Sequence, residues 1–185
     1  MRIAIHQPNF MPWYPFFEKI KNCDKFIMLT HCQFEKNGYQ NRFNFNDNWY
    51  TMSVKKGLEP IKDKIYINPK NDWDRIKNKL PKYKTILDEF DDCIVESLEG
   101  TNSMIIQKLC NMLDIKTEIV PDYPDEYTST DRLVELCKTF GGTEYFSGIG
   151  AKVYLDESKF SNQNIKVSYQ ETSIKKHTLE VLWKN

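Results

Sequence analysis

Residues 2–29 read RIAIHQPNFMPWYPFFEKIKNCDKFIML, and this stretch decides the fold. Arg2–Ile5 is a short apolar run typical of a buried strand, and the prolines that follow it rule out a helix or a central strand there. Tyr14–Lys21 places its aromatic residues on one face of a helix, and Lys25–Leu29 is a second buried strand. Strand, loop, helix and strand within about thirty residues indicate a right-handed parallel crossover.

After this unit the sequence pattern changes from apolar runs to alternating polar and apolar residues. Arg42–Phe45 and Trp49–Val54 alternate polar and apolar side chains around the turn-forming Asn46–Asn48, which predicts a β-hairpin. The remaining pattern predicts strands over residues 64–67, 117–120, 144–146 and 165–169, and helices over 71–80, over 85–90, from 101 onwards, and from about 131 to the glycines at 141–142.

Strands that alternate with helices on both sides of a hairpin are typical of an α/β fold. We therefore expect one Rossmann-like three-layer domain over residues 1–185, with a β-hairpin insertion that makes the sheet mixed. A length of 185 residues agrees with a single domain.

The composition excludes several function classes. Lys plus Arg equals Asp plus Glu at 26 each, so no nucleic-acid footprint is expected. No apolar run is long enough to cross a membrane. The chain opens without the pattern of a signal peptide, and an odd number of cysteines, five, indicates free thiols. We expect a cytoplasmic protein.

Ligands in such sheets bind at the carboxyl ends of the parallel strands, and this singles out His6–Trp13, Thr30–Lys36 and Ser147–Gly150. His6 can act as an acid or a base there, and Gln7 and Asn9 supply donors and acceptors. The alternative for His6 is a structural role, bonded to a carbonyl in a proline-rich turn.

Lys36 and Arg42 are candidates to hold a phosphate or a carboxylate, and the alternative is a pair of solvated charges. Ser147 and Gly148 could present backbone N–H groups to an anion. Cys32 follows His31, but it is interpreted as a small buried side chain and not as a nucleophile.

The sequence lacks the spacing typical of metal and cofactor sites. The three histidines lack metal-ligand spacing, so no metal site is expected, and no cofactor fingerprint occurs. The acidic residues around Asp122 are interpreted as a solvated turn.

Three segments resemble the WbqC-like family of bacterial surface-polysaccharide gene clusters. The first is HQPNFMPW at 6–13 with FEKI at 17–20, the second is CQFEK at 32–36 with QNR at 40–42, and the third is Ser147-Gly148 with YLD at 154–156. The chain departs from the family pattern at Thr30-His31, where an Asp-Asp pair is common, and at Tyr39, where Trp is usual.

The resemblance implies an enzyme that modifies a nucleotide-linked amino sugar, with N-acyl or aminoacyl transfer as the preferred reaction. His6 would be the base, and the other groups would bind the nucleotide-sugar and the acyl or aminoacyl donor. Those substrate-binding residues are Gln7, Asn9, Trp13, Gln33, Lys36, Asn41, Arg42, Trp49, Ser147 and Gly148. The alternative is a non-catalytic binding or assembly protein of the same pathway.

Overall fold

A five-stranded sheet forms the centre of the computed structural model, which describes residues 1–171 and 175–183. All its neighbouring strands run parallel, in the order β5-β2-β1-β6-β7. The strands are β1 (Arg2–His6), β2 (Lys25–Met28), β5 (Glu118–Pro121), β6 (Glu144–Ser147) and β7 (Lys166–Tyr169). The strand order reverses between β1 and β6, so the crevice for a ligand is expected beside the carboxyl ends of these two strands.

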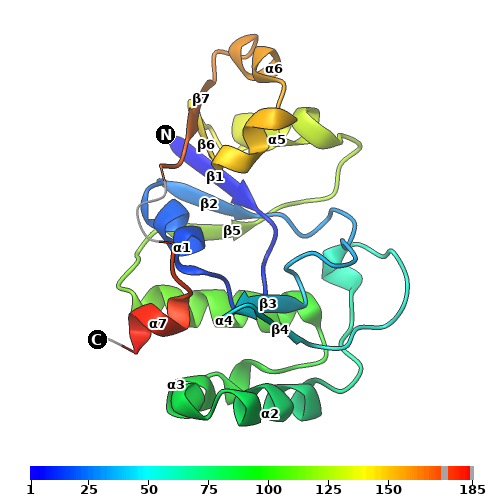
Figure 1. Cartoon of the computed structure of the whole chain (residues 1–185). Coiled ribbons are helices and arrows are strands. Elements are labelled where there is room, and N and C mark those ends of the chain that lie inside the picture. Colours follow the sequence, from blue (N-terminus) through cyan, green and yellow to red (C-terminus); the bar gives the residue numbers. More distant parts are fainter. Residues whose placement is uncertain (172–174, 184–185) are drawn as a thin grey trace.

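Helices cover both faces of this sheet (Figure 1). One face carries α1 (Tyr14–Lys21) and α4 (Leu98–Met112), and the other carries α5 (Ser129–Thr139) and α6 (Glu157–Ser161). β1 explains the division, because Ala4 packs into the cluster on the α1 and α4 side, whereas Ile3 and Ile5 pack into the cluster on the α5 side. A strand buried on both faces is a feature of parallel sheets, and the Rossmann-like α/β class is confirmed.

The hairpin lies in an insertion between β2 and β5. It consists of β3 (Arg42–Phe45) and β4 (Asn48–Thr51), joined by Asn46 and Asp47 with positive φ angles of 49° and 59°. Two left-handed residues match the twist of a two-residue hairpin turn. The insertion continues through α2 (Pro69–Lys79) and α3 (Lys84–Asp88), which lie beyond α4 as seen from the sheet (Figure 1).

The expectation that the hairpin mixes the strand directions of the main sheet needs correction. The hairpin pairs only within itself and forms a separate two-stranded sheet. Its apolar side chains face the core instead of a sheet edge: the Phe43 ring lies 5.8 Å from that of Phe10, and Phe10 lies 6.0 Å from Trp73 of α2. Packing around Phe10 therefore holds the hairpin, and the main sheet is parallel throughout.

Other expected boundaries shift for local reasons. The helix expected from Thr101 begins at Leu98, because Ser97 Oγ accepts the hydrogen bond from Gly100 N at 3.0 Å. Thr101 instead bonds the backbone of Val95. Residues 64–67 form only isolated bridges, with Val54 and Ser97 as partners in turn, and not a strand. The short 3-10 helices were not expected, and they are η1 (Ile61–Asp63), η2 (Pro81–Tyr83), η3 (Asp91–Cys93) and η4 (Ile149–Val153).

Two further expectations are confirmed. The five cysteines are free thiols. Gly141 ends α5 with a φ of 71°, the left-handed cap that the sequence indicates. Within the described residues, no helix combines the length and apolar character needed to cross a bilayer.

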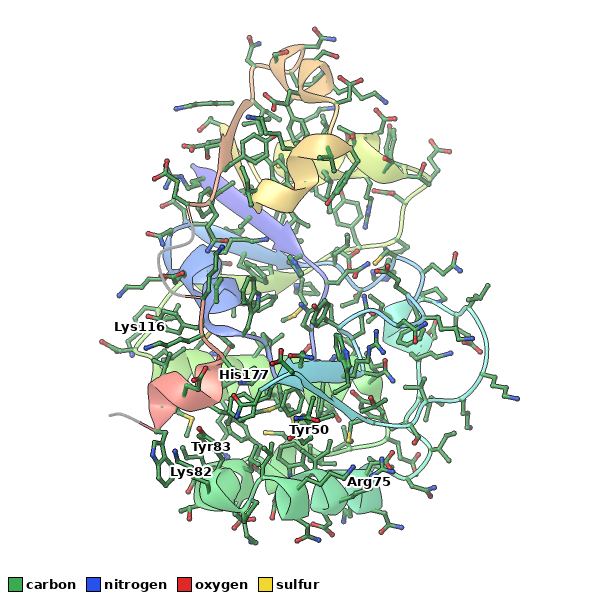
Figure 2. The ribbon with its side chains drawn as sticks, in the orientation of Figure 1. Tyr50, Arg75, Lys82, Tyr83, Lys116 and His177 are labelled. Carbon is green, nitrogen blue, oxygen red and sulfur yellow. The ribbon has the colours of Figure 1, made fainter. Side chains whose placement is uncertain are left out.

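His177 anchors the C-terminal helix α7 (Thr178–Leu182) to the loop after β1. Its Nε2 donates to Met11 O at 3.1 Å, and its Nδ1 accepts from Leu179 N at 3.3 Å. Its ring lies 5.1 Å from Phe43, beside the hairpin at the start of α7 (Figure 2). Burial lowers the pKa of His177 to about 4, although the bond to Met11 O raises it.

This buried neutral ring makes stability depend on pH. The folded-state pKa lies below the unfolded value of about 6.5, so stability is lost as the pH falls below 6.5. Between pH 7.5 and pH 5 we expect His177 to account for a loss of about 2 kcal/mol in the free energy of unfolding. In His177→Asn, which keeps a capping side chain, urea unfolding should show a loss smaller by that amount. An unchanged pH dependence would contradict the assignment.

Candidate functional site

Three cavities meet at His6, at the carboxyl end of β1. The main cavity, of about 910 Å³, opens over the ends of β1, β2 and β5. The hairpin cavity, of about 640 Å³, lies between the loop after β1 and the hairpin. The Lys19 cavity, of about 530 Å³, lies between α1 and the loop after β6. His6 lines all three cavities. It therefore lies at the crevice that the strand order predicts.

A buried carboxylate, Asp122, holds two side chains that line the main cavity, His31 and Arg132. It follows β5 directly and its side chain is 0% exposed. Oδ1 accepts from Thr30 N and Thr30 Oγ1, both at 2.9 Å, and from His31 Nδ1 at 2.8 Å. Oδ2 accepts from Arg132 Nη2 of α5 at 3.0 Å. The interpretation of this region as a solvated turn is therefore wrong for Asp122.

The charge of Asp122 is held by its donors. Burial alone would raise the pKa of this carboxyl, but hydrogen bonds from His31, Thr30 and Arg132 outweigh burial and lower it. The group is therefore a carboxylate at neutral pH, buried and fully surrounded by donors.

His31 and Asp122 form a dyad with the geometry of a general base. A carboxylate only accepts, so His31 Nδ1 carries the proton of their 2.8 Å bond. Nε2 then keeps its lone pair, and no hydrogen bond to it occurs within residues 1–171 and 175–183. The side chain is 21% exposed and lines the main cavity. A histidine whose Nδ1 is held by a carboxylate can take a proton from a bound substrate with its Nε2.

His6 has a different character. Its Nδ1 donates to Gln7 O at 2.9 Å, and its ring meets Phe16 edge to face at 5.2 Å. Burial, together with the nearby charge of Lys19, lowers the pKa of His6 to about 3, although the bond to Gln7 O raises it. His6 is thus neutral at pH 7 and a weak base, better suited to accept a hydrogen bond from a ligand than to remove a proton.

Most of the expected binding residues gather around His6. Gln7, Asn9, Trp13 and Trp49 line the hairpin cavity with it, and Gln33 lines the main cavity. Gln7 is held between Cys32 Sγ, 3.2 Å from its Nε2, and Gln40, which donates to its Oε1. Gly148 lines the Lys19 cavity.

Four expected binding residues lie outside these cavities. Lys36 is exposed and Ser147 is buried, and neither lines any of the three. Asn41 Nδ2 donates to Met52 O at 2.7 Å within the hairpin. Arg42 donates to the carbonyls of Asn37 and Gly38 and lies 4.0 Å from the centre of the Trp49 ring. The side-chain donors of Asn41 and Arg42 therefore bond the backbone of the hairpin and of the loop that precedes it, which the sequence pattern could not reveal.

Cys32 lines the main cavity, yet its environment disfavours nucleophilic chemistry. Burial is the main cause that raises the pKa of its thiol, and the hydrogen bond from Gln7 does not cancel this effect. A protonated thiol is a poor nucleophile. Cys32 packs against the core, as expected, but it is half-buried and not fully buried.

The main cavity carries a negative surplus. Four carboxylates line it, from Glu35, Asp63, Asp125 and Glu126, against the two cations Lys62 and Arg132. Arg132 is already paired with Asp122 and Asp125. Acidic walls favour a cationic or amine-bearing ligand over a phosphate. In the part of the chain that the structure describes, no group of three or more metal-ligating side chains is found.

Sequence reasoning missed Asp122, Arg132 and Lys19 as site residues. A usable signal was present for Asp122, because it follows the predicted strand 117–120, and the rule that selected the loops after the first two strands applies to this strand as well. Arg132 and Lys19 lie inside helices, and only the tertiary structure brings them to the cavities.

The Asp122 network predicts a large loss of stability on neutralisation. In Asp122→Asn, Arg132 and His31 lose a buried charged acceptor, and we expect the free energy of unfolding to fall by about 2–4 kcal/mol. Asp63→Asn, which changes an exposed carboxylate on the same cavity, should change it by about 0.5 kcal/mol or less. If urea unfolding gave the same loss for both variants, Asp122 would not be what holds the end of β2 and α5 to the end of β5.

Comparison of the sequence with known proteins identifies a family. A profile described as the WbqC-like protein family matches residues 7–180. The chain is similar to uncharacterized protein Rv1507c of Mycobacterium tuberculosis, with 27% identity over 187 residues that cover 91% of this chain and 81% of the relative. No solved structure matches the chain significantly. The match begins directly after β1 and includes the other four strands of the sheet and the whole insertion, and the chain belongs to the WbqC-like protein family.

Proposed function

We propose that this protein transfers an acyl or aminoacyl group to the amine of a nucleotide-linked sugar in the biosynthesis of a surface polysaccharide. The observation that carries the proposal is the His31–Asp122 dyad, in which the buried Asp122 holds a histidine that lines an acidic cavity. Membership of the WbqC-like family supports the polysaccharide pathway. The name of the mycobacterial relative describes no activity.

The dyad supplies the proton transfers that acyl transfer needs. The amine nitrogen attacks the acyl carbonyl carbon, and His31 Nε2 takes a proton from that nitrogen as the N–C bond forms. The tetrahedral intermediate then collapses, the bond to the donor's leaving group breaks, and His31 returns the proton to that group. Asp122 stabilises the imidazolium between these steps and fixes the ring in one tautomer.

The walls of the cavity suit an amine. Glu35, Asp63 and Glu126 are exposed carboxylates around its rim, and together they attract an ammonium group before it is deprotonated. His6 is neutral at pH 7 and lines the same cavity, and in this proposal it accepts a hydrogen bond from the sugar. In this assignment His6 orients the substrate and His31 is the base.

A non-catalytic binding or assembly protein of the same pathway is the second candidate. It predicts that His6, Gln7 and Asn9 lie on a flat exposed patch. Instead they line one cavity, Asn9 is buried, and the pKa of His6 is lowered to about 3, mainly by burial. These observations favour the enzyme.

The test is to incubate the protein with nucleotide-linked amino sugars and acyl thioesters, aminoacyl esters or activated amino acids. Mass spectrometry should then detect the acylated sugar. We expect His31→Asn and Asp122→Asn to lower kcat by about 10²–10⁴-fold, with a smaller effect on KM, because they remove proton transfer more than binding.

Cys32→Ser is the matched control, since it alters the residue next to His31 but leaves the dyad intact. Its turnover should stay within a few-fold of wild type. Full activity of His31→Asn would contradict the proposal, and loss of activity in Cys32→Ser alone would point to a thiol mechanism. Binding of the sugar without turnover by any donor class would favour the second candidate.

A further inference from the structure

Three lysines are buried in the described part of the chain, and they differ in their partners. Lys64 Nζ donates to Glu59 Oε2 and Gly57 O, both at 2.8 Å. Lys77 Nζ pairs with three aspartates, the nearest being Asp91 at 2.6 Å. Lys19 is 6% exposed, yet its Nζ makes no hydrogen bond or ion pair within residues 1–171 and 175–183. Buried charges are normally paired, so this ammonium needs an explanation.

The Lys19 ammonium lies at the topological switch point of the sheet. Lys19 is in the second half of α1, and helical side chains lean towards the N-terminus, which brings the amine back towards the carboxyl ends of the strands. A β-carbon at Gly148, directly after β6, would lie only 3.8 Å from Nζ. His6 ends the neighbouring strand β1. The amine is therefore placed where the order of the strands reverses.

The Lys19 cavity differs from the main cavity in charge and in polarity. Its walls include the apolar rings of Trp13 and Phe16, and its charged groups are Lys19, Lys175 and Glu171. The net charge of these groups is positive, whereas the groups that line the main cavity have a negative net charge. A site with one buried ammonium and aromatic walls suits an oxyanion attached to a flat or apolar body.

We propose that the Lys19 cavity binds an oxyanion, a phosphate or a carboxylate group of a small molecule, and that Lys19 is the cation that holds it. That this oxyanion is the phosphate of the nucleotide-linked sugar rests on the proposed function. The anion site itself rests only on the unpaired ammonium and its place in the sheet.

The protonation of Lys19 agrees with this role. Burial lowers the pKa of Lys19 to about 8, although its interaction with Cys23 raises it. A bound anion favours the charged form, so affinity should be full below pH 8 and should fall as the pH rises through 8. The other groups that face the amine are His6, the Cys23 thiol, Glu171 and Lys175. Of these, His6 is neutral throughout this range, and burial raises the pKa of the Cys23 thiol to about 12.

Thermal unfolding of the full chain at pH 7 and constant ionic strength tests the site, with inorganic phosphate as one probe and acetate as the other. At tenfold over its Kd, the bound probe should raise Tm by about 3–6 °C. Lys19→Met should have a higher Tm than wild type without a probe, because it removes an unpaired buried charge, and it should show no shift. Lys21→Met, an exposed change on the same helix, should keep the wild-type shift.

Gly148→Ala is a second variant that does not alter the lysine. The φ of −70° at this position accepts any residue, and the added methyl meets only Lys19 Nζ, so it should fold normally and reduce the shift. A larger shift with phosphate or with acetate identifies the source of the oxyanion. Absence of a shift with both probes in wild type, or a shift that persists in Lys19→Met, overturns the proposal. The readout involves no turnover, so failure of acyl transfer would leave this result standing, and the reverse is equally true.

Discussion

The arrangement of the main cavity depends on one buried carboxylate. Asp122 accepts hydrogen bonds from Thr30 and His31 at the end of β2 and from Arg132 on α5, while its own backbone follows β5. The end of β2 is thereby fixed to the end of β5, 92 residues later in sequence, and to the first turn of α5. The carboxylate is inaccessible to water, so water cannot replace a donor that is lost. Each missing donor would leave the negative charge of Asp122 less well compensated, and all of its donors are therefore needed.

The site is divided by charge. Acidic groups surround the main cavity, which His31 lines, and the buried ammonium of Lys19 lines the cavity on the other side of His6. A neutral histidine between the two belongs to both and favours neither sign of charge. Such a division would orient a ligand that has an amine at one end and an oxyanion at the other, before any chemistry takes place.

The sequence predicted the class of the fold and the neighbourhood of the site, but not the chemistry within it. Alternation and apolar runs located the five parallel strands, because a strand buried on both faces has few other patterns available. His6, Gln7 and Asn9 were found because they end the first strand. The sequence could not show that Arg42 donates its hydrogen bonds to the carbonyls of Asn37 and Gly38, or that Asp122 is buried. The Arg42 bonds are local, but they depend on the conformation of the loop that precedes β3. The burial of Asp122 depends on contacts with Thr30 and His31, which lie more than 90 residues earlier in the chain.

The position of β1 in the middle of the sheet also bears on how the chain reaches its native state. β1 pairs with β2 at residue 25 but with β6 only at residue 144, and β2 pairs with β5 across the whole hairpin insertion. A nascent chain therefore has an unpaired edge on its central strand until the last quarter of synthesis. High contact order of this kind slows folding, and the exposed edge is a place where incomplete chains would associate.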